Sequence, residues 1–175
     1  MSKINPLLTI RKNFSLVGAI SKGLLLIFFD AFYLNQGGIA LITGLWVLLI
    51  RLPLAVKKKN PAIRVQHLQN VSIYILAVIL VFTFNSLNNV LARKRAEILI
   101  SAVYTFEAKQ RRYPQSLEEL VPIFIKKVPL AKYTLNQNQF YYQVPDSKAS
   151  LFYVEFPPFG RPIYLFNTHQ WDYLD

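Results

Sequence analysis

Two ionisable side chains, Lys22 and Asp30, lie inside an apolar stretch of the sequence, where a charge is costly. Eight residues apart on one helix, they would be separated by about 12 Å and about 80° around the axis, too far to pair directly. Three amides, Asn85, Asn88 and Asn89, follow in a later apolar stretch at a spacing that places them on one helix face. The favoured interpretation is that Asp30 faces these amides in a satisfied polar patch. An ion or proton path through Lys22 and Asp30 is the alternative.

The remaining residue types offer little catalytic chemistry. The two histidines, His67 and His169, are expected on opposite sides of a membrane, so they should not share a metal ion or a triad. Glu118 and Glu119 are adjacent on a short helix and point apart, which suits capping better than a carboxylate pair. The chain has no cysteine, which excludes disulfides, thiol catalysis and thiolate metal sites. The sequence therefore predicts a protein that is not an enzyme, with no cofactor and no metal site.

The charge of the chain is strongly positive, with 20 Lys and Arg against 9 Asp and Glu. The densest basic cluster consists of Lys57, Lys58 and Lys59 with Arg51 and Arg64, and it lies between two long apolar runs. Such a loop is typical of the cytoplasmic side of a membrane protein, where it can contact anionic lipid headgroups. Nucleic acid is therefore not an expected partner, although clustered basic residues can also bind phosphates.

Three apolar stretches are long enough to cross a bilayer, which takes about 20 helical residues. They are residues 14–34, 38–56 and 68–90, and they make residues 1–90 a predicted transmembrane region in the lipid bilayer. Because the basic loop stays inside, the N-terminus is expected in the cytoplasm. Residues 91–175 are then expected on the periplasmic or extracellular side of a bacterial inner (cell) membrane. This location is the same whether the first stretch spans fully or lies at the interface.

A row of small residues, Ser15, Ala19 and Gly23, follows helical spacing in the first apolar stretch. Small side chains allow a second helix to approach closely. Packing within the chain is the favoured interpretation, and a face for a homo-oligomer stays open.

The second half of the sequence, residues 91–175, predicts a small α+β domain. The helix of the third apolar stretch should continue to about residue 112, because this region lacks Gly and Pro. Leu99, Val103 and Phe106 give it an apolar stripe for packing. Tyr113 should end it, because the following proline disfavours helical geometry at that residue.

Two further elements are expected after this helix. Ser116 to Glu119 has the form of a capping box, which starts a short helix that carries Leu117 and Leu120 into the core. Aromatic and β-branched runs separated by turn residues then predict an antiparallel meander. Its strands are expected at residues 139–144, 150–156, 162–167 and 171–174. The fold class predicted is thus about three transmembrane helices plus an α+β domain in which a long helix packs on an antiparallel sheet.

The segment YTFEAKQRRYPQSLEELVP, from Tyr104 to Pro122, resembles the end of the long helix in major pseudopilins of type II secretion and related type IV pilin-like proteins. In that family a membrane helix continues into a soluble helix, followed by a Tyr-Pro turn, a short Ser-Leu-x-x-Leu helix and an antiparallel sheet. The resemblance covers roughly residues 71–175 and implies a pilin-like fold. Nothing before Val71 matches the family's leader and processing site, so no functional residue is carried over.

The expected strands carry more aromatic side chains than one sheet face can bury, because alternate residues point to opposite faces. Exposed Tyr and Trp side chains favour protein interfaces or the headgroup zone of a membrane. The candidates for an interaction surface are Tyr141, Tyr153, Tyr164, Trp171 and Tyr173. A sheet covered on both faces is the alternative that stays open.

These features favour a non-enzymatic inner-membrane protein whose periplasmic pilin-like domain binds another envelope protein in an envelope or secretion-related assembly. Two alternatives stay open. One is a membrane immunity or accessory protein that acts through its transmembrane bundle on a toxin or channel, and the other is a small transporter component.

Overall fold

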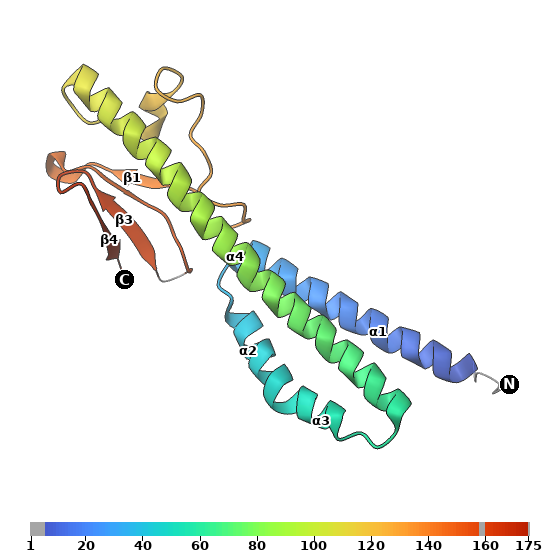
Figure 1. Ribbon diagram of the computed structural model, residues 1–175. Helices are drawn as coiled ribbons and strands as arrows, with labels where there is room; N and C mark the ends of the chain where they lie inside the picture. The colour runs from blue at the N-terminus through green and yellow to red at the C-terminus, as the bar shows by residue number, and fades with distance from the viewer. Residues whose placement is uncertain (1–5, 158–159, 175) are drawn as a thin grey trace. The chain divides into compact units, whose positions relative to one another are not determined.

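The computed structural model describes residues 6–157 and 160–174 of the chain (Figure 1). These residues form two compact units, one from the N-terminal end up to Asn85 and the other from Ser86 onward. The fold is mostly helical, with one small four-stranded antiparallel sheet in the second unit. The predicted combination of long helices with an antiparallel sheet is confirmed.

Three long helical segments build the first unit. They are α1 (Pro6–Ile27) continued by the π-helical η1 (Phe28–Leu34), α2 (Gly38–Trp46) continued by the π-helical η2 (Val47–Arg51) and by α3 (Leu52–Val56), and the first part of α4 (Pro61–Gln110). Each segment is long and apolar enough to cross a bilayer, by length and composition. The second apolar segment, Gly38–Val56, has the bounds that the sequence predicted.

Small residues allow α1 and α4 to pack closely. A Cβ atom at Gly23 would lie 3.5 Å from side-chain atoms of Ile73 and Ala77. The Ser15 hydroxyl accepts a hydrogen bond of 2.8 Å from the Asn70 side-chain amide. The small-residue row of α1 therefore packs against α4 within the chain, as the favoured interpretation expected.

Most of the apolar surface of the first unit faces outward. Only 22%, 17% and 28% of the three apolar windows are buried within the chain. Leu49 and Ile42, for example, are 71% and 70% exposed. An apolar surface of this extent is unfavourable in water and suits contact with lipid or with another protein.

One helix of 50 residues, α4, contributes to both units. The Asn60 side-chain oxygen accepts hydrogen bonds from the N–H groups of Ala62 (3.0 Å) and Ile63 (3.3 Å), and Pro61 suits the first helical position. After Pro61 the helix contains no glycine or proline. It ends where Arg111 adopts a left-handed conformation with φ of 58°. The predicted continuation of the third apolar helix is confirmed, and the helix begins earlier than Leu68.

The second unit contains a four-stranded meander. Its strands are β1 (Tyr141–Gln143), β2 (Ser150–Phe152), β3 (Arg161–Leu165) and β4 (Gln170–Leu174), and short 3-10 helices lie at η3 (Leu117–Leu120) and η4 (Pro145–Ser147). Each strand pairs antiparallel with the next in chain order. The meander confirms the prediction, but β1 and β2 are shorter than expected. The turn expected before β3 includes residues 158 and 159, which lie outside the described residues.

The core of the second unit lies between α4 and one face of the sheet (Figure 1). Leu99, Val103 and Phe106 of α4 are buried there, and so are Leu117 and Leu120 of η3, as predicted. One row of the sheet packs into this core across all four strands. The row consists of Tyr142, Leu151, Tyr164 and Trp171. The helix and the sheet therefore stabilise each other by burying complementary apolar faces.

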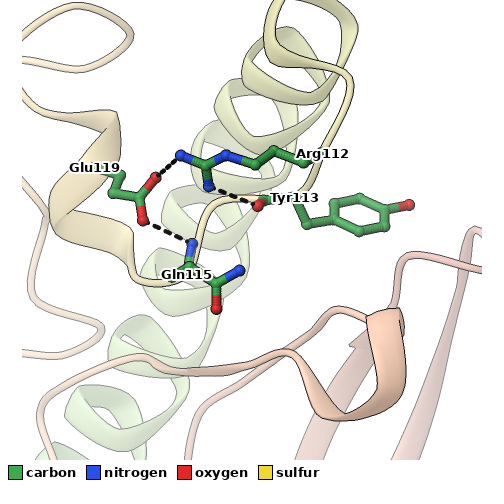
Figure 2. A network of polar contacts seen from close by, with 4 residues as sticks. All are labelled: Arg112, Tyr113, Gln115 and Glu119. Carbon is green, nitrogen blue, oxygen red and sulfur yellow. Dashed lines mark hydrogen bonds and ion pairs between the residues drawn. The ribbon is translucent and has the colours of Figure 1, made fainter.

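The capping box expected at Ser116 is wrong in its details (Figure 2). The Ser116 side chain makes no capping hydrogen bond. Glu119 Oε1 instead accepts the N–H of Gln115 at 3.0 Å, and Glu119 Oε2 pairs with Arg112 Nη2 at 2.9 Å. Arg112 also donates to the carbonyl oxygen of Tyr113 at 3.1 Å. Arg112, two residues past the end of α4, and the Gln115 N–H therefore hold the carboxylate that would otherwise close the box.

This network predicts a pH-dependent contribution to stability. The hydrogen bond from Arg112 and then the Gln115 N–H lower the pKa of Glu119 below its ordinary value of 4.5. A lowered pKa stabilises the folded chain above pH 4.5, and this stabilisation is lost as the pH falls through the folded-state pKa. Glu119→Gln should therefore lower the unfolding midpoint of the detergent-solubilised chain at about pH 7, and the deficit should become smaller at about pH 3.

Glu118→Gln is the matched control, because Glu118 is the exposed neighbour on the same turn. A deficit of Glu119→Gln that is the same at both pH values would assign the effect to packing and contradict the electrostatic explanation.

Candidate functional site

Asp30 is completely buried, with 0% of its surface exposed, in the π-helical turn η1. Its Oδ1 accepts the N–H of Gly37 at 2.9 Å, and its Oδ2 accepts the N–H of Ala40 at 2.6 Å. These N–H groups lie at the start of α2, where a helix offers no backbone partner for its first donors. The positive end of the helix dipole also favours a carboxylate there. Asp30 therefore caps α2 across the turn that joins it to α1.

This arrangement corrects the expectation that Asp30 faces the three asparagines. Asn85 does lie beside the same turn, since a Cβ atom at Gly37 would be 3.5 Å from Asn85 Nδ2. Asn88 belongs to the second unit, where its Oδ1 accepts the N–H of Tyr133 at 3.0 Å. The two oxygens of Asp30 bond to backbone donors because the unpaired amides of α2 lie only a few residues further along the chain.

Buried polar atoms remain around the turn between α1 and α2. Asn35 and Asn85 are 2% and 4% exposed, and within the described residues Asn35 Oδ1 and both side-chain polar atoms of Asn85 have no hydrogen-bond partner. Asn89 Oδ1 is likewise buried without a partner in that part of the chain. These amides could accept or donate further bonds. The Asp30 carboxylate, in contrast, is already occupied by two backbone donors, which favours a structural role over a proton path.

Lys22 lies in a different place from the Asp30 cap. It lines a cavity of about 410 Å³ in the first unit together with Thr43, Trp46 and Tyr74. The remaining lining side chains are apolar. Lys22 can therefore place a charge at the rim of an otherwise apolar cavity.

The expected aromatic interaction surface is wrong for two of its five residues. Tyr153 and Tyr164 are only 3% and 8% exposed, because both pack into the core of the second unit. Trp171 is half-buried, and the guanidinium carbon of Arg93 lies 3.6 Å from its ring centroid. Burial also raises the pKa of Tyr153 to about 12, so this phenol stays neutral. The sheet face that contacts α4 takes up these aromatics, which the alternation pattern alone could not assign to a face.

Tyr141 and Tyr173 remain exposed, at 39% and 58%. Tyr141 stacks on Phe152 of the neighbouring strand, with ring centroids 5.0 Å apart and planes 15° apart. Ile163 follows Phe152 in the same row across the sheet. Figure 1 shows α4 along the sheet, and the core lies between α4 and the opposite row of strand residues. Tyr141 and Phe152 line an open cavity of about 330 Å³ together with Ser116, Leu117 and Glu118 at η3. We call Tyr141, Phe152 and Ile163 the outer row. The predicted surface included only Tyr141 of these three, because alternation along a strand does not specify which face packs on the helix.

A group of three polar side chains, Tyr104, Tyr164 and His169, connects α4 with the turn between β3 and β4. The Tyr104 hydroxyl lies 2.5 Å from His169 Nδ1 and 3.1 Å from the Tyr164 hydroxyl, and the Tyr104 and His169 rings stack. His169 is a turn residue, as expected, with a left-handed φ of 57°. Burial and the hydrogen bond to Tyr164 raise the pKa of Tyr104, so its hydroxyl stays protonated near neutral pH. The group suits hydrogen bonding rather than base catalysis.

An open cavity of about 660 Å³ adjoins this group along α4. Tyr104, Tyr164 and Trp171 line it on one side, and Glu97, Ser101 and Thr105 line it along the helix. Within the described residues, no three His, Asp or Glu side chains gather in a way that could hold a metal ion. The cavity therefore offers aromatic and hydroxyl contacts.

Comparison of the chain with protein-family models, with curated proteins and with solved structures finds no match. The resemblance of the Tyr104–Pro122 segment to pseudopilins therefore stays a prediction that rests on those residues.

The capping role of Asp30 makes a testable prediction. Asp30→Ala leaves the N–H groups of Gly37 and Ala40 buried without an acceptor, which costs about 1–3 kcal/mol for each unsatisfied group. Asp30→Asn keeps one carbonyl oxygen, so its effect should be smaller. Hydrogen exchange of these two amides in the detergent-solubilised chain should accelerate in the order wild type, Asn variant, Ala variant.

Thr43→Val, elsewhere on α2, is the matched control and should leave both amides protected. Unchanged exchange of the Gly37 and Ala40 amides in Asp30→Ala would contradict the capping role.

Proposed function

We propose that this chain is a non-enzymatic bacterial inner-membrane protein whose extracytoplasmic α+β domain binds another protein of the cell envelope. In this proposal residues 14–34, 38–56 and 68–90 cross the bilayer. The basic loop around Lys58 lies in the cytoplasm, and residues 91–175 lie in the periplasm or outside the cell.

The outward apolar surface of the first unit supports the membrane part of the proposal. Three helical segments of sufficient length expose side chains such as Leu49 and Ile42 rather than burying them within the chain. A bilayer makes such exposure favourable, because lipid tails replace water around these side chains. The basic residues between Arg51 and Arg64 favour the orientation, because short loops rich in Lys and Arg stay in the cytoplasm.

The outer row of the sheet is the main support for the proposed binding role. Tyr141 and Phe152 form a stacked aromatic pair in the row opposite the core row, and they line an open cavity of about 330 Å³. Stacked aromatic side chains offer a large contact area at a low cost in conformational entropy, and aromatics are enriched at protein interfaces. Ile163 follows in the same row but is only 6% exposed, so the accessible part of the row is the Tyr141–Phe152 pair. A protein partner that covers this pair would bury apolar area that is now in contact with solvent.

A pilin-like assembly is the kind of partner that the sequence favours. The second unit has a long helix on an antiparallel meander, which is compatible with the fold that the Tyr104–Pro122 segment implies. On the basis of this resemblance, we assign the partner to an envelope or secretion-related assembly.

The cavity that Lys22 lines favours a second candidate function. A charged side chain at an apolar cavity between helices could recognise a helix of another membrane protein. The chain would then act as an immunity or accessory protein through its first unit. A transporter role is less well supported, because both oxygens of Asp30 are bonded to backbone donors.

Complementation of a deletion strain tests the proposal. Tyr141→Ser combined with Phe152→Ser removes the stacked pair from the outer row, and we expect it to abolish complementation at an unchanged protein level. Lys22→Gln serves as the matched variant in the first unit and should complement fully. Limited proteolysis of the second unit checks that the double variant is folded.

Two outcomes would contradict the proposal. One is full complementation by a chain that ends at Arg95. The other is loss of complementation by Lys22→Gln while the outer-row variant stays active, which would support the immunity or accessory role.

A further inference from the structure

A closed loop follows η3 in the second unit, and we call residues 130–138 the tyrosine loop after Tyr133. The N–H of Ala131 donates to the carbonyl oxygen of Asn138 at 2.7 Å. The Asn138 side chain donates in turn to the carbonyl oxygen of Thr134 at 2.9 Å. Gln137 adopts a left-handed conformation, with φ of 49°, between these two ends. The loop therefore has a defined shape that its own hydrogen bonds maintain.

Two residues of α4 hold the tyrosine loop against the helix. Asn88 Oδ1 accepts the N–H of Tyr133 at 3.0 Å. Arg95 donates to the carbonyl oxygen of Leu130 at 2.8 Å and to the Tyr133 hydroxyl at 2.5 Å, and its guanidinium carbon lies 4.4 Å from the Tyr133 ring centroid. Asn88 and Arg95 are about two helical turns apart, so they lie on the same face of α4. The loop is thus fixed along α4 at two levels.

Burial divides the side chains of the loop into an inner and an outer set. Ala131, Lys132 and Thr134 are 0%, 0% and 6% exposed. Lys132 Nζ donates to the carbonyl oxygen of Glu155 at 2.6 Å, and burial lowers the pKa of Lys132 to about 8. The outer set contains no charged residue. It includes three large apolar side chains, Leu130, Tyr133 and Leu135, which are 46%, 61% and 62% exposed, and the polar tip residues Asn136 and Gln137 are exposed as well.

This distribution is the reverse of what a loop in water favours. A lysine normally keeps its ammonium group in solvent, and large apolar side chains normally avoid it. Here the lysine is inside while two leucines and a tyrosine are outside. The inversion indicates that the outer set of the loop contacts something other than water.

The position of Asn88 along α4 indicates what the outer set of the loop contacts. Asn88 lies in the last turn of the apolar segment 68–90, and the helix from Leu68 to Asn88 rises about 30 Å, the thickness of a hydrocarbon core. The N–H of Tyr133 is bonded at that level of α4. Leu87 and Val90 of the same turn are 61% and 52% exposed. Tyrosine is enriched at this depth of a bilayer, and arginine there can reach lipid phosphates.

We propose that the tyrosine loop inserts into the interface of the bilayer that α4 crosses. Leu130 and Leu135 contact the outer ends of the acyl chains, and Tyr133 lies at the level of the headgroups, where Arg95 is near their phosphates. This inference rests on the proposed membrane insertion of α4. It adds a second lipid contact that fixes the second unit at the membrane surface.

Single-cysteine variants test the proposal directly, because the chain has no cysteine of its own. A nitroxide spin label is attached to Leu135→Cys, to Ile79→Cys in the middle of the apolar segment, and to Gln143→Cys on β1. The full chain is reconstituted in phosphatidylcholine–phosphatidylglycerol nanodiscs. Power saturation then compares collisions with oxygen, which partitions into lipid, and with a water-soluble nickel chelate.

We expect the label at residue 135 to collide more often with oxygen than with the nickel chelate. Its depth in the bilayer should lie between the depths of the labels at residues 79 and 143. Its nickel collision rate should rise several-fold when Asn88→Ala and Arg95→Gln release the loop. If the label at residue 79 lies in lipid while that at residue 135 matches residue 143, the loop proposal is wrong and the membrane anchor stands. If residue 79 is as accessible to nickel as residue 143, the proposed membrane insertion itself fails.

Discussion

Both units depend on the uninterrupted helix α4. Its first part packs against α1 and α2 through small residues such as Ala77, and its last part supplies Leu99, Val103 and Phe106 to the core beneath the sheet. A proline inside either part of the helix would weaken the core that this part supplies, because an interior proline costs about 3 kcal/mol and redirects the chain. The sequence changes from apolar to charged along this helix without a glycine or proline after Pro61. The two units can therefore share one helix without a linker.

The chain satisfies backbone polar groups locally where its surroundings are apolar. The start of α2 has donors that no water would reach in a bilayer, and Asp30 accepts two of them from the preceding π-helical turn. The start of α4, next to the basic loop, is capped by the side chain of Asn60. In the same way Asn88 accepts a loop N–H at the end of the apolar segment. Asp30, Asn60 and Asn88 therefore cap helices or fix a loop by accepting backbone N–H groups.

Periodicity predicted the elements of this fold well, and it predicted contacts poorly. The bounds of Gly38–Val56, the long helix with its stripe of Leu99 and Val103, and the meander follow from local patterns of apolar residues. The partners of Asp30 and the burial of Tyr153 and Tyr164 depend on which elements meet, which spacing along the chain does not specify. The tyrosine loop was missed for the same reason, because its inverted burial of Lys132 appears only when the loop closes against α4 and Glu155.

The most direct test of the account is the side of the membrane on which each half of the chain lies. The chain has no cysteine of its own, so single-cysteine variants can be labelled at one chosen position. Lys58→Cys reports on the basic loop, and Gln143→Cys reports on the sheet. With the outer membrane permeabilised, a membrane-impermeant maleimide should label Gln143→Cys in intact cells and Lys58→Cys only after lysis. Labelling in the opposite pattern would contradict the orientation, and with it the assignment of the α+β domain to the envelope.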